Sequence, residues 1–285
     1  MESRTYQKYQ ELQKLHYIMT TFPDNEETVT VGRVKFADDP GVENEVINLY
    51  PGVEYQTFEG FGGAFTDSAA YVYSLMDEAQ KEELIRMYYG EDQMNYTLGR
   101  LHLDSCDFSL EQYEADSDPE CRELWAEYLC RYIAELRAEG LHVCRVLVQN
   151  EPVAVQTWDS CIYSAQEEKE FLRDFLYPAL QRAGLSDIEI FIWDHNKERA
   201  FERACEIIDA DTDPMIAGIA FHWYSGDHFE TLAIIRERFP EKKLVLSEAC
   251  IEYYKFDAGD YLANAQKYAH DMIGNFNAGM TVWVE

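Results

Sequence analysis

The pattern of apolar and polar positions becomes regular from Phe58 onward. Short runs rich in Val, Ile and Leu alternate with longer segments in which apolar residues recur at helical spacing. The short runs predict buried strands, and the longer segments predict amphipathic helices. Such an alternation predicts a parallel sheet with helices packed outside it. Because the stretch from Gly60 to Glu285 is close to the typical size of a (β/α)₈ barrel, we expect an α/β fold of the (β/α)₈ TIM-barrel type.

The sequence shows seven strands of this barrel, near residues 60, 98, 145, 190, 219, 245 and 282. Helices are expected at 68–88, 120–138, 165–183, 198–208, 229–239 and 261–275. The eighth strand of a complete barrel is not recognisable. A doubly wound open sheet is the structural alternative. However, the sequence GFGGAFTD at 60–67 does not match the G-x-G-x-x-G pattern expected after the first strand of a dinucleotide-binding sheet.

The N-terminal part of the chain lacks this regular alternation. Residues 1–22 favour a helix, because apolar residues recur there at roughly helical spacing. The stretches 28–34 and 45–49 show β-branched alternation and are expected to form strands or irregular arms. We therefore divide the chain into an N-terminal helix with extended arms, residues 1–57, and a (β/α) barrel, residues 58–285.

Two of the predicted strands end in a glutamate. The sequence VCRVLVQNEP at 143–152 is an apolar run typical of a strand covered on both faces, and Pro152 ends it directly after Glu151. The sequence KLVLSEA at 243–249 places Glu248 after a second run of this kind. Either glutamate alone would more often be a solvated strand end. Two of them at the carboxyl ends of parallel strands favour a mechanism that uses a pair of carboxylates.

Other polar and aromatic side chains also follow the predicted strands. In a barrel such residues converge on one mouth. Rings that stack on sugar faces, together with acids and amides that bind hydroxyl groups, are the lining expected of a carbohydrate site. A single Trp or Tyr is more often part of the core, so it is the recurrence at strand ends that indicates a site. The residues are Asp67, Arg100, His102, Asp104, Asp107, Asn150, Asp194, His195, Asn196, His222, Trp223, Tyr224 and Trp283.

A metal site is the rival interpretation of the same residues. His102, Asp104, His195, His222 and Glu248 could gather a zinc ion or a binuclear centre, as in barrel hydrolases. However, the sequence contains neither H-x-H nor H-E-x-x-H. The carboxylate pair is therefore the stronger hypothesis, and it requires no metal or cofactor.

Composition narrows the class of partner. The 54 acidic and 24 basic residues give a formal net charge of −30, which repels nucleic acid and anionic membranes and suits a neutral substrate. No apolar run is long enough to span a bilayer, and the N-terminus lacks the apolar core of a signal peptide. The seven cysteines show no C-x-x-C spacing and are typical of reduced thiols. We therefore expect a cytoplasmic protein; its oligomeric state stays open.

Five motifs occur in the order seen in one enzyme family: GFGGAFTDSAA, LGRLHLDSCDFSL, VQNEP, FHWY and LSEA. The stretch from Phe58 to Trp283 resembles glycoside hydrolase family 30. This is the glucosylceramidase-like group, which includes β-glucosidases, β-xylosidases and β-1,6-glucanases. The resemblance implies a retaining (β/α)₈ hydrolase with an attached β-sandwich, acting on a β-linked glycoside without metal or cofactor.

The resemblance also implies roles for individual residues. Glu151 would be the acid/base, and Glu248 the nucleophile. Retention would require their carboxyl groups to lie about 5–5.5 Å apart. It would also require a raised pKa for Glu151 and an ionised Glu248, with Arg100 as its counter-charge. Positions that organise the sugar or the nucleophile match Arg100, Asp107, Asn150, His222 and Tyr224, and less decisively Asp67 and Trp283.

The chain departs from the family between its second and third barrel strands. Residues 109–118 are the whole connection where family members carry a further helix and strand. The sequence also ends at Glu285, where the family continues into its sandwich. Unpaired strand edges are unfavourable, so the gap could close up or be filled by the stretches at 28–34 or 45–49 or by another copy of the chain.

We expect a gap that is imperfectly closed, with a site open near Asp107. Two alternatives to an active glycosidase follow. One is a catalytically impaired sugar-binding barrel. The other is the metal-dependent barrel hydrolase described above.

Overall fold

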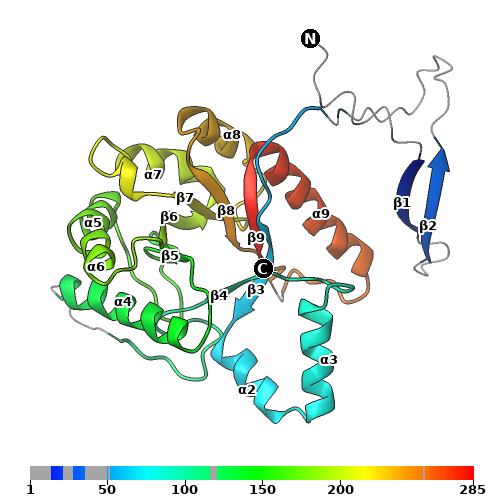
Figure 1. Ribbon diagram of the computed structural model, residues 1–285, viewed down its shortest axis with the longest axis horizontal. Helices are drawn as coiled ribbons and strands as arrows, with labels where there is room; N and C mark the ends of the chain where they lie inside the picture. The colour runs from blue at the N-terminus through cyan, green and yellow to red at the C-terminus, as the bar shows by residue number, and fades with distance from the viewer. Residues whose placement is uncertain (1–13, 22–27, 36–49, 51, 116–120, 253) are drawn as a thin grey trace. The chain divides into compact units, whose positions relative to one another are not determined.

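The structure is a computed structural model (Figure 1). The chain divides into two compact units, Met1–Tyr55 and Gln56–Glu285, and each is described by itself. The described residues are 14–21, 28–35, 50, 52–115, 121–252 and 254–285.

The first unit contains an antiparallel pair of strands, β1 (Lys14–Thr21) and β2 (Thr28–Lys35). Tyr17 lies opposite Gly32, where an added Cβ would come within 2.4 Å of the tyrosine ring, so a larger residue there would displace that ring. The prediction of a helix over 1–22 is wrong for Lys14–Thr21, because every residue of this stretch has a cross-strand partner in β2. The predicted strand at 28–34 is confirmed, and the stretch 45–49 lies outside the described residues.

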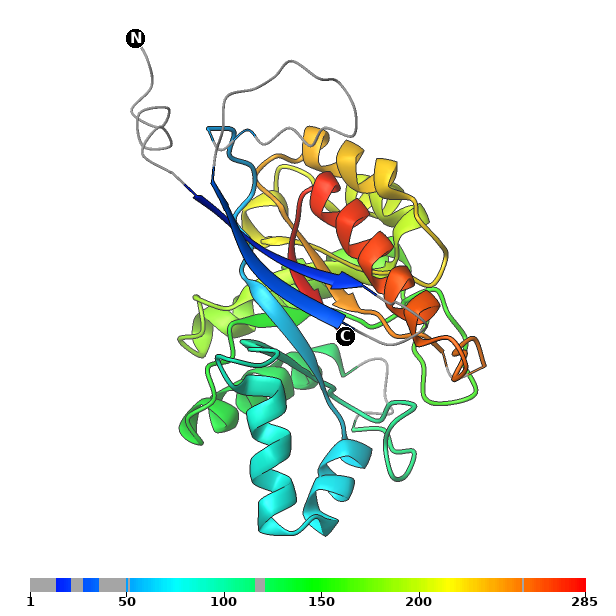
Figure 2. The same ribbon diagram turned by 90° about the vertical axis from the view of Figure 1, so that its right-hand side faces the viewer.

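The second unit is built on a parallel sheet whose seven strands match those predicted from the sequence (Figure 2). Their order is β4-β3-β9-β8-β7-β6-β5, and they form a curled half-barrel of the TIM-barrel type. The strands are β3 (Gly60–Phe65), β4 (Leu98–Leu101), β5 (Arg145–Leu147), β6 (Glu189–Asn196), β7 (Gly218–His222), β8 (Lys243–Glu248) and β9 (Met280–Val284).

The two edges of this sheet are β4 and β5, which are not paired with each other in the described part of the chain. They are also the strands on either side of the short connection at 109–118. No strand pairing closes the gap in the described residues, which agrees with the expected imperfect closure. A site open near Asp107 stays a prediction. The expected filling of the gap by the stretch at 28–34 stays untested, and β2 pairs with β1 within the first unit.

The helices follow the strands in alternation. They are α2 (Asp67–Leu75), α3 (Glu78–Tyr89), α4 (Arg122–Ala138), α5 (Ala165–Glu170), α6 (Tyr177–Arg182), α7 (Ala200–Ile207), α8 (Phe229–Arg238) and α9 (Tyr261–Ala278). A π-helical turn at Phe171–Leu176 joins α5 to α6. Short 3₁₀ turns occur at Lys197–Arg199 and Asp213–Met215.

The predicted helix at 68–88 is two helices. Asp77 caps α3 by accepting from the Gln80 amide at 2.9 Å, and the Gln80 side chain accepts from the Asp77 amide at 3.0 Å. This reciprocal cap fixes a helix start in the middle of the predicted helix, because an N-cap residue is not itself helical.

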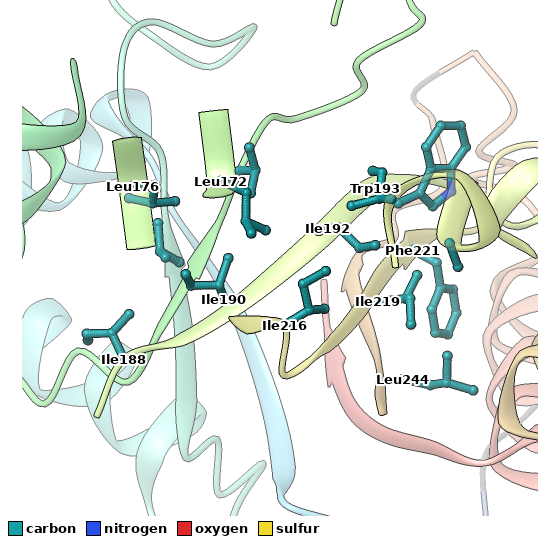
Figure 3. Packing of buried hydrophobic residues seen from close by; sticks show 14 of the residues in the cluster. Leu172, Leu176, Ile188, Ile190, Ile192, Trp193, Ile216, Ile219, Phe221 and Leu244 are labelled. Atoms are coloured by element: carbon teal, nitrogen blue, oxygen red, sulfur yellow. The ribbon is translucent and has the colours of Figure 1, made fainter. Parts of the chain in front are cut away.

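The strands bury alternate side chains on opposite faces of the sheet. Ile190, Ile192 and Leu244 point into the cluster between the sheet and the helices, where Figure 3 shows them with Leu172 and Leu176 of the π-helical turn. The other face carries a separate apolar cluster of Phe191, Ala220, Val245, Val282 and Val284. The sequence runs of β6 and β8 are continuously apolar because both of their faces are covered.

Charged side chains meet at the amino-terminal ends of the strands. Arg145 donates to Glu189 at 2.9 Å and also to Glu59. Lys243 donates to Glu189 at 2.6 Å and to Glu59 at 3.3 Å. The network thus connects the edge strand β5 with the residue that precedes β3. Within the described residues, no helix has the length and apolar character needed to cross a membrane.

Candidate active site

The two glutamates stand at the carboxyl ends of β5 and β8. Glu248 is the last residue of β8. Glu151 follows β5 with a left-handed backbone (φ 43°), and its amide donates to the Asp194 carbonyl at 2.9 Å. Left-handed backbone is uncommon for a residue with a side chain and tends to occur at functional sites. The side chain of Glu151 is 13% exposed and that of Glu248 is 37% exposed.

Bulges at the ends of neighbouring strands orient the residues between these glutamates. The register of β6 against β7 shifts between Trp193 and His195, and both Trp193 and Asp194 have positive φ angles. The register of β7 against β8 shifts between Phe221 and His222. A bulge inserts an extra residue and turns side chains to new directions, as is common beside active sites. Asp194 and His222 are thereby brought together.

The imidazole of His222 lies close to the carboxyl groups of both glutamates. Its Nδ1 lies 3.4 Å from Glu151 Oε1, and its Nε2 lies 3.9 Å from Glu248 Oε2 and 3.0 Å from Asp194 Oδ1. The ring is fully buried. Burial alone would favour the neutral imidazole. The charge of Glu248 and the contacts with Asp194 and Glu151 outweigh burial, so the pKa of this imidazole rises to about 9.

Arg100, on β4, reaches across the mouth of the half-barrel. Its Nη1 donates to Glu248 Oε2 at 3.0 Å and to the Ser247 carbonyl at 2.8 Å. Its Nη2 donates to Asn150 Oδ1 at 2.8 Å and to Asp194 Oδ2 at 3.0 Å. The rigid fork of a guanidinium suits such a set of acceptors. Arg100 is therefore the counter-charge of Glu248 that the sequence predicts.

Asp194 is a buried acceptor at the centre of the site. Besides Arg100 and His222, the Ser247 hydroxyl donates to its Oδ1 at 2.6 Å. Burial raises the carboxyl pKa, but the charge of Arg100 and the donor from His222 outweigh burial, and the pKa of Asp194 is lowered. Sequence reasoning missed the role of Ser247, although this residue directly precedes Glu248.

The pKa of Glu151 is lowered, and the prediction of a raised pKa is wrong in this structure. Burial favours the protonated carboxyl, but the neighbouring His195 and His222 outweigh it. His195 Nδ1 lies 3.4 Å from Glu151 Oε1. Gln156 Nε2 donates to the other oxygen, Oε2, at 3.1 Å. Gln156 was not predicted, because it lies in an irregular loop with no pattern to mark it.

Tyr224 and Asp107 face Glu248. The Tyr224 hydroxyl donates to Glu248 Oε1 at 2.9 Å and lies 3.6 Å from Cys250 Sγ. Burial and the charge of Glu248 raise the pKa of Tyr224, so the phenol stays protonated and remains a donor. Burial, and then the charge of Glu248, also raise the pKa of Asp107.

Three other predicted site residues, Asp67, Trp223 and Trp283, contact residues other than the two glutamates. Asp67 Oδ1 is 3.7 Å from His102 Nε2. The Trp223 indole donates to the Cys250 carbonyl at 3.0 Å and packs edge-on against Trp283, with ring centroids 6.1 Å apart. Trp283 is 2% exposed and belongs to the core. Sugar contacts by Asp67, Trp223 and Trp283 stay predictions.

One group in the described part of the chain could hold a metal ion. Glu151, His195 and His222 each offer a ligand atom, and these atoms lie within 4.8 Å of one another. Of the residues in the rival metal interpretation, His195 and His222 belong to this group, whereas His102, Asp104 and Glu248 do not. The structure therefore brings two of those five residues together at Glu151.

The glycosyl hydrolase family 30 TIM-barrel domain matches residues 58–124 and 117–285 of the chain. The two matches overlap at 117–124, after β4, where the sequence shows no eighth barrel strand. The crystal structure of SrfJ from Salmonella typhimurium is similar with a TM-score of 0.88 and 32% identity, over 95% of this chain and 74% of that one. An endo-β1,6-glucanase has the same fold, with a TM-score of 0.79 and 23% identity over 94% of this chain and 72% of that one.

Curated relatives include putative glucosylceramidase 4 of Caenorhabditis elegans, 24% identical over 310 residues, covering 80% of this chain and 59% of the relative. Lysosomal acid glucosylceramidase of Mus musculus is 21% identical over 316 residues, covering 84% and 61%. The chain thus spans about three fifths of the length of these relatives. The family match over most of the sequence and the similarity to SrfJ show that this chain belongs to glycosyl hydrolase family 30.

Proposed function

We propose that the chain is a retaining β-glycoside hydrolase in which Glu248 is the nucleophile and Glu151 the acid/base. The observation that carries this proposal is the unequal environment of the two carboxyl groups around His222. Glu248 is paired with Arg100 and accepts from Tyr224, and these contacts orient its two carboxyl oxygens for attack. Glu151 Oε1 lies 3.4 Å from an imidazole nitrogen of His195 and of His222, and a proton can pass between the His222 ring and this carboxyl group.

The first half-reaction forms a covalent glycosyl–enzyme. A Glu248 oxygen attacks the anomeric carbon, and the bond from that carbon to the leaving oxygen breaks while Glu151 delivers a proton to this oxygen. In the second half-reaction water attacks the same carbon. Its proton passes to Glu151, and the bond to Glu248 breaks. Asn150 would bind the sugar 2-hydroxyl, with its amide oriented by Arg100.

The proton for the leaving group is held by the Glu151–His222 pair. Before the sugar binds, the imidazolium of His222 carries it, since the pKa of that ring is raised and that of Glu151 is lowered. A bound sugar excludes water and weakens the charged pair's solvation, which favours transfer of the proton to the carboxylate. Glu151 is then the proton donor of the first step.

The substrate class that we propose is a β-glucoside, including lipid glycosides such as glucosylceramide. Curated relatives are named glucosylceramidases, and a role in sphingolipid or carbohydrate metabolism rests on that likeness. A net charge of −30 is compatible with a neutral sugar. The endo-β1,6-glucanase of the same fold makes β-1,6-linked glucans a second substrate to assay.

Two other functions each have an observation in their favour. The unpaired edges of β4 and β5 favour a sugar-binding barrel with impaired turnover, because a loosely held site loses large factors in rate. The group of Glu151, His195 and His222 favours a metal-dependent hydrolase. Hydrolysis of aryl β-glucosides with and without a chelator separates these from the proposed function: turnover that survives chelation supports the carboxylate mechanism.

A good leaving group can restore turnover when the acid/base is replaced, but not when the nucleophile is replaced. We expect Glu248→Gln to abolish turnover of every aryl β-glucoside, by a factor of at least about 10⁴, because nothing replaces the nucleophile. Glu151→Gln should keep the first step for leaving groups that need no proton and lose it for poor ones. The measurement is kcat/KM across a series of leaving groups.

The matched control is Glu135→Gln, on the exposed surface of α4, where the side chain is 72% exposed. It should leave all rates unchanged. Retention of most wild-type activity by Glu248→Gln would overturn the assignment of the nucleophile. A uniform loss across the leaving-group series in Glu151→Gln would overturn that of the acid/base.

A further inference from the structure

We propose that Glu151, His195 and His222 form a binding site for a divalent transition-metal ion, represented by Zn²⁺, whose occupancy is incompatible with hydrolysis. The inhibition rests on the proposed acid/base role of Glu151, whereas the binding does not. Both histidines are buried, and Glu151 lies between them. Two imidazole nitrogens and one carboxylate oxygen are a ligand set that zinc commonly takes.

The distances fit a tetrahedral ion. Bonds of about 2.0–2.1 Å to nitrogen and oxygen place the ligand atoms of a tetrahedron roughly 3.4 Å apart. His195 Nδ1 and His222 Nδ1 each lie 3.4 Å from the same atom, Glu151 Oε1. All three ligand atoms lie within 4.8 Å of one another, so a small closing movement between the imidazoles completes the triangle. The fourth position would be open to water.

One ligand atom makes no hydrogen bond of good geometry in the described part of the chain, although it lies 3.4 Å from Glu151 Oε1. The Nδ1 atom of His195 is buried, and His195 is 9% exposed. A buried polar atom without a partner costs free energy, and such an atom in a native structure often marks a bound ion or another functional contact. An ion beside Glu151 Oε1 would satisfy this nitrogen.

The surrounding contacts orient the other two ligands. His222 Nε2 lies 3.0 Å from Asp194 Oδ1, which fixes its second nitrogen as the donor and leaves Nδ1 for an ion. A carboxylate that accepts from the distal nitrogen is the usual support of a histidine that binds zinc. Gln156 donates to Glu151 Oε2 at 3.1 Å, so Oε1 is the oxygen that faces the imidazoles.

The local charge also favours a cation. Glu151, Glu248, Asp194 and Asp107 lie around the site, and Arg100 pairs with Glu248 and Asp194 rather than with Glu151. The net charge of −30 raises the concentration of cations near the chain. An ion at this site takes the place of the proton between His222 and Glu151. The carboxylate can then no longer protonate a leaving oxygen.

The test is titration of the full chain with Zn²⁺ alone, followed by calorimetry. We expect one ion to bind and His195→Gln to weaken it by at least about 100-fold, since the loss even of a supporting group costs 10–100-fold. Glu151→Gln removes a different ligand and should have a similar effect, so the test survives if one variant fails to fold. Thermal melting checks folding of each variant.

Two controls separate this site from other zinc ligands. His270→Gln removes an exposed histidine that lies 3.0 Å from Asp227. Among the described residues this pair belongs to no group of three possible metal ligands, so the affinity for Zn²⁺ should stay unchanged. Cys250→Ser removes the thiol near Tyr224 and should also leave it unchanged. Substitution by Co²⁺ should give the absorption of nitrogen and oxygen ligands without a thiolate band.

The outcomes distinguish the metal site from the proposed function. Binding that is lost in His195→Gln, with inhibition of aryl β-glucoside hydrolysis at the same midpoint, supports both. Binding without inhibition supports the site and contradicts the acid/base role of Glu151. Equal affinity in His195→Gln and wild type, loss of binding in Cys250→Ser, or no binding to an active enzyme would overturn the site.

Discussion

The two sides of the half-barrel differ sharply in how they are packed. On the side of β6 to β9, almost every strand residue is buried, and α7, α8 and α9 each bury part of one face. On the side of β3 and β4, neither α2 nor α3 buries a single residue, and β4 is no more than half-buried. Figures 1 and 2 show α2 and α3 extending away from the rest of the sheet.

The candidate active site draws on both sides. The packed side supplies Asp194, His222 and Glu248, and the sparsely packed side supplies Arg100 and Asp107. Arg100 bonds to Asn150 and Asp194, so it connects one edge of the open sheet with the other edge and with the centre of the site. The charge network of Glu59 and Arg145 makes a similar connection at the opposite end of the strands. Polar contacts thus span the gap that a barrel strand would fill.

The largest expected effect on stability comes from replacing a buried isoleucine of the packed side, compared with the same replacement on the sparsely packed side. Ile192 of β6 is fully buried, whereas Ile85 of α3 is 45% exposed. Ile192→Ala should lower the free energy of unfolding by about 2–5 kcal/mol, because it leaves a cavity in the core. Ile85→Ala should cost less than about 1 kcal/mol. Urea unfolding measures both, and similar costs would show that α3 is packed as tightly as β6.

The next effect tests Arg100 as the connection between the two sides. Arg100→Met leaves Glu248 and Asp194 without their guanidinium and should cost about 3 kcal/mol of stability. It should also lower kcat/KM by about 100-fold or more, because the nucleophile loses its orientation. Arg100→Lys keeps the charge but not the fork, and should recover part of the stability.

Arg131→Met is the control for Arg100, because that side chain is 82% exposed on α4 and should contribute almost nothing. If Arg100→Met melts like the wild type and loses activity alone, Arg100 positions the nucleophile without holding the edges together.

The sequence predicts the packed side much better than the sparse side. The strands at 190, 219, 245 and 282 are recognisable because both faces are covered, so the apolar runs are continuous. Because the runs are continuous, their ends can also be recognised in the sequence. Glu151 and Glu248 stand out because each follows the end of such a run. In contrast, the periodic pattern at 68–88 does not show the cap at Asp77. The pattern at 1–22 predicts a helix where β1 forms, because the pairing of β1 depends on β2, a separate stretch of the chain.

The candidate site was predictable in its residue types and less so in its electrostatics. Strand ends identify Asp194 and His222, but the bulges that turn them toward each other depend on backbone angles that no pattern shows. The lowered pKa of Glu151 depends on His195 and His222, which are distant in sequence. Ser247 and Gln156 act through single hydrogen bonds, which leave no periodic signal.

A smaller effect tests the packed side through pH. The folded-state pKa of His222 is about 9, above the unfolded value near 6.5. The charged ring is therefore favoured in the folded state, and its stabilisation is complete below about pH 6.5. It is lost as the pH rises toward 9, which amounts to on the order of 2–3 kcal/mol.

Urea unfolding of the wild type from pH 6 to 9.5 should show this decline, and His222→Asn should flatten it. The lowered pKa values of Glu151 and Asp194 act in the opposite direction, since their stabilisation is present above about pH 4 and is lost as the pH falls through their folded values. If the free energy of unfolding of His222→Asn falls as steeply between pH 6 and 9.5 as that of the wild type, other groups cause the decline.

The smallest effect tests the sparse side by completing it. We expect that a helix–strand segment from a family member, inserted between Leu110 and the position of Glu120, raises both the melting temperature and turnover. A strand between β4 and β5 would pair edges that have no partner in the described residues. About 1–2 kcal/mol from such pairing corresponds to several degrees in melting temperature for a chain of this size.

The control for this insertion is a Gly/Ser segment of equal length, which lengthens the loop without offering a strand and should raise neither quantity. The present loop already makes contacts of its own: the Gln112 side chain accepts from the Asp159 amide at 2.7 Å, and the Ser105 hydroxyl donates to the Tyr113 carbonyl at 2.8 Å. Insertion would disrupt these contacts, so a rise or a fall in melting temperature and turnover shows whether the new strand outweighs their loss. A family segment that lowers both quantities as much as the control would mean that these contacts, with Arg100, close the seven-stranded sheet better than an eighth strand can. Protection of the β4 and β5 amides from hydrogen exchange would then be high already in the unmodified chain.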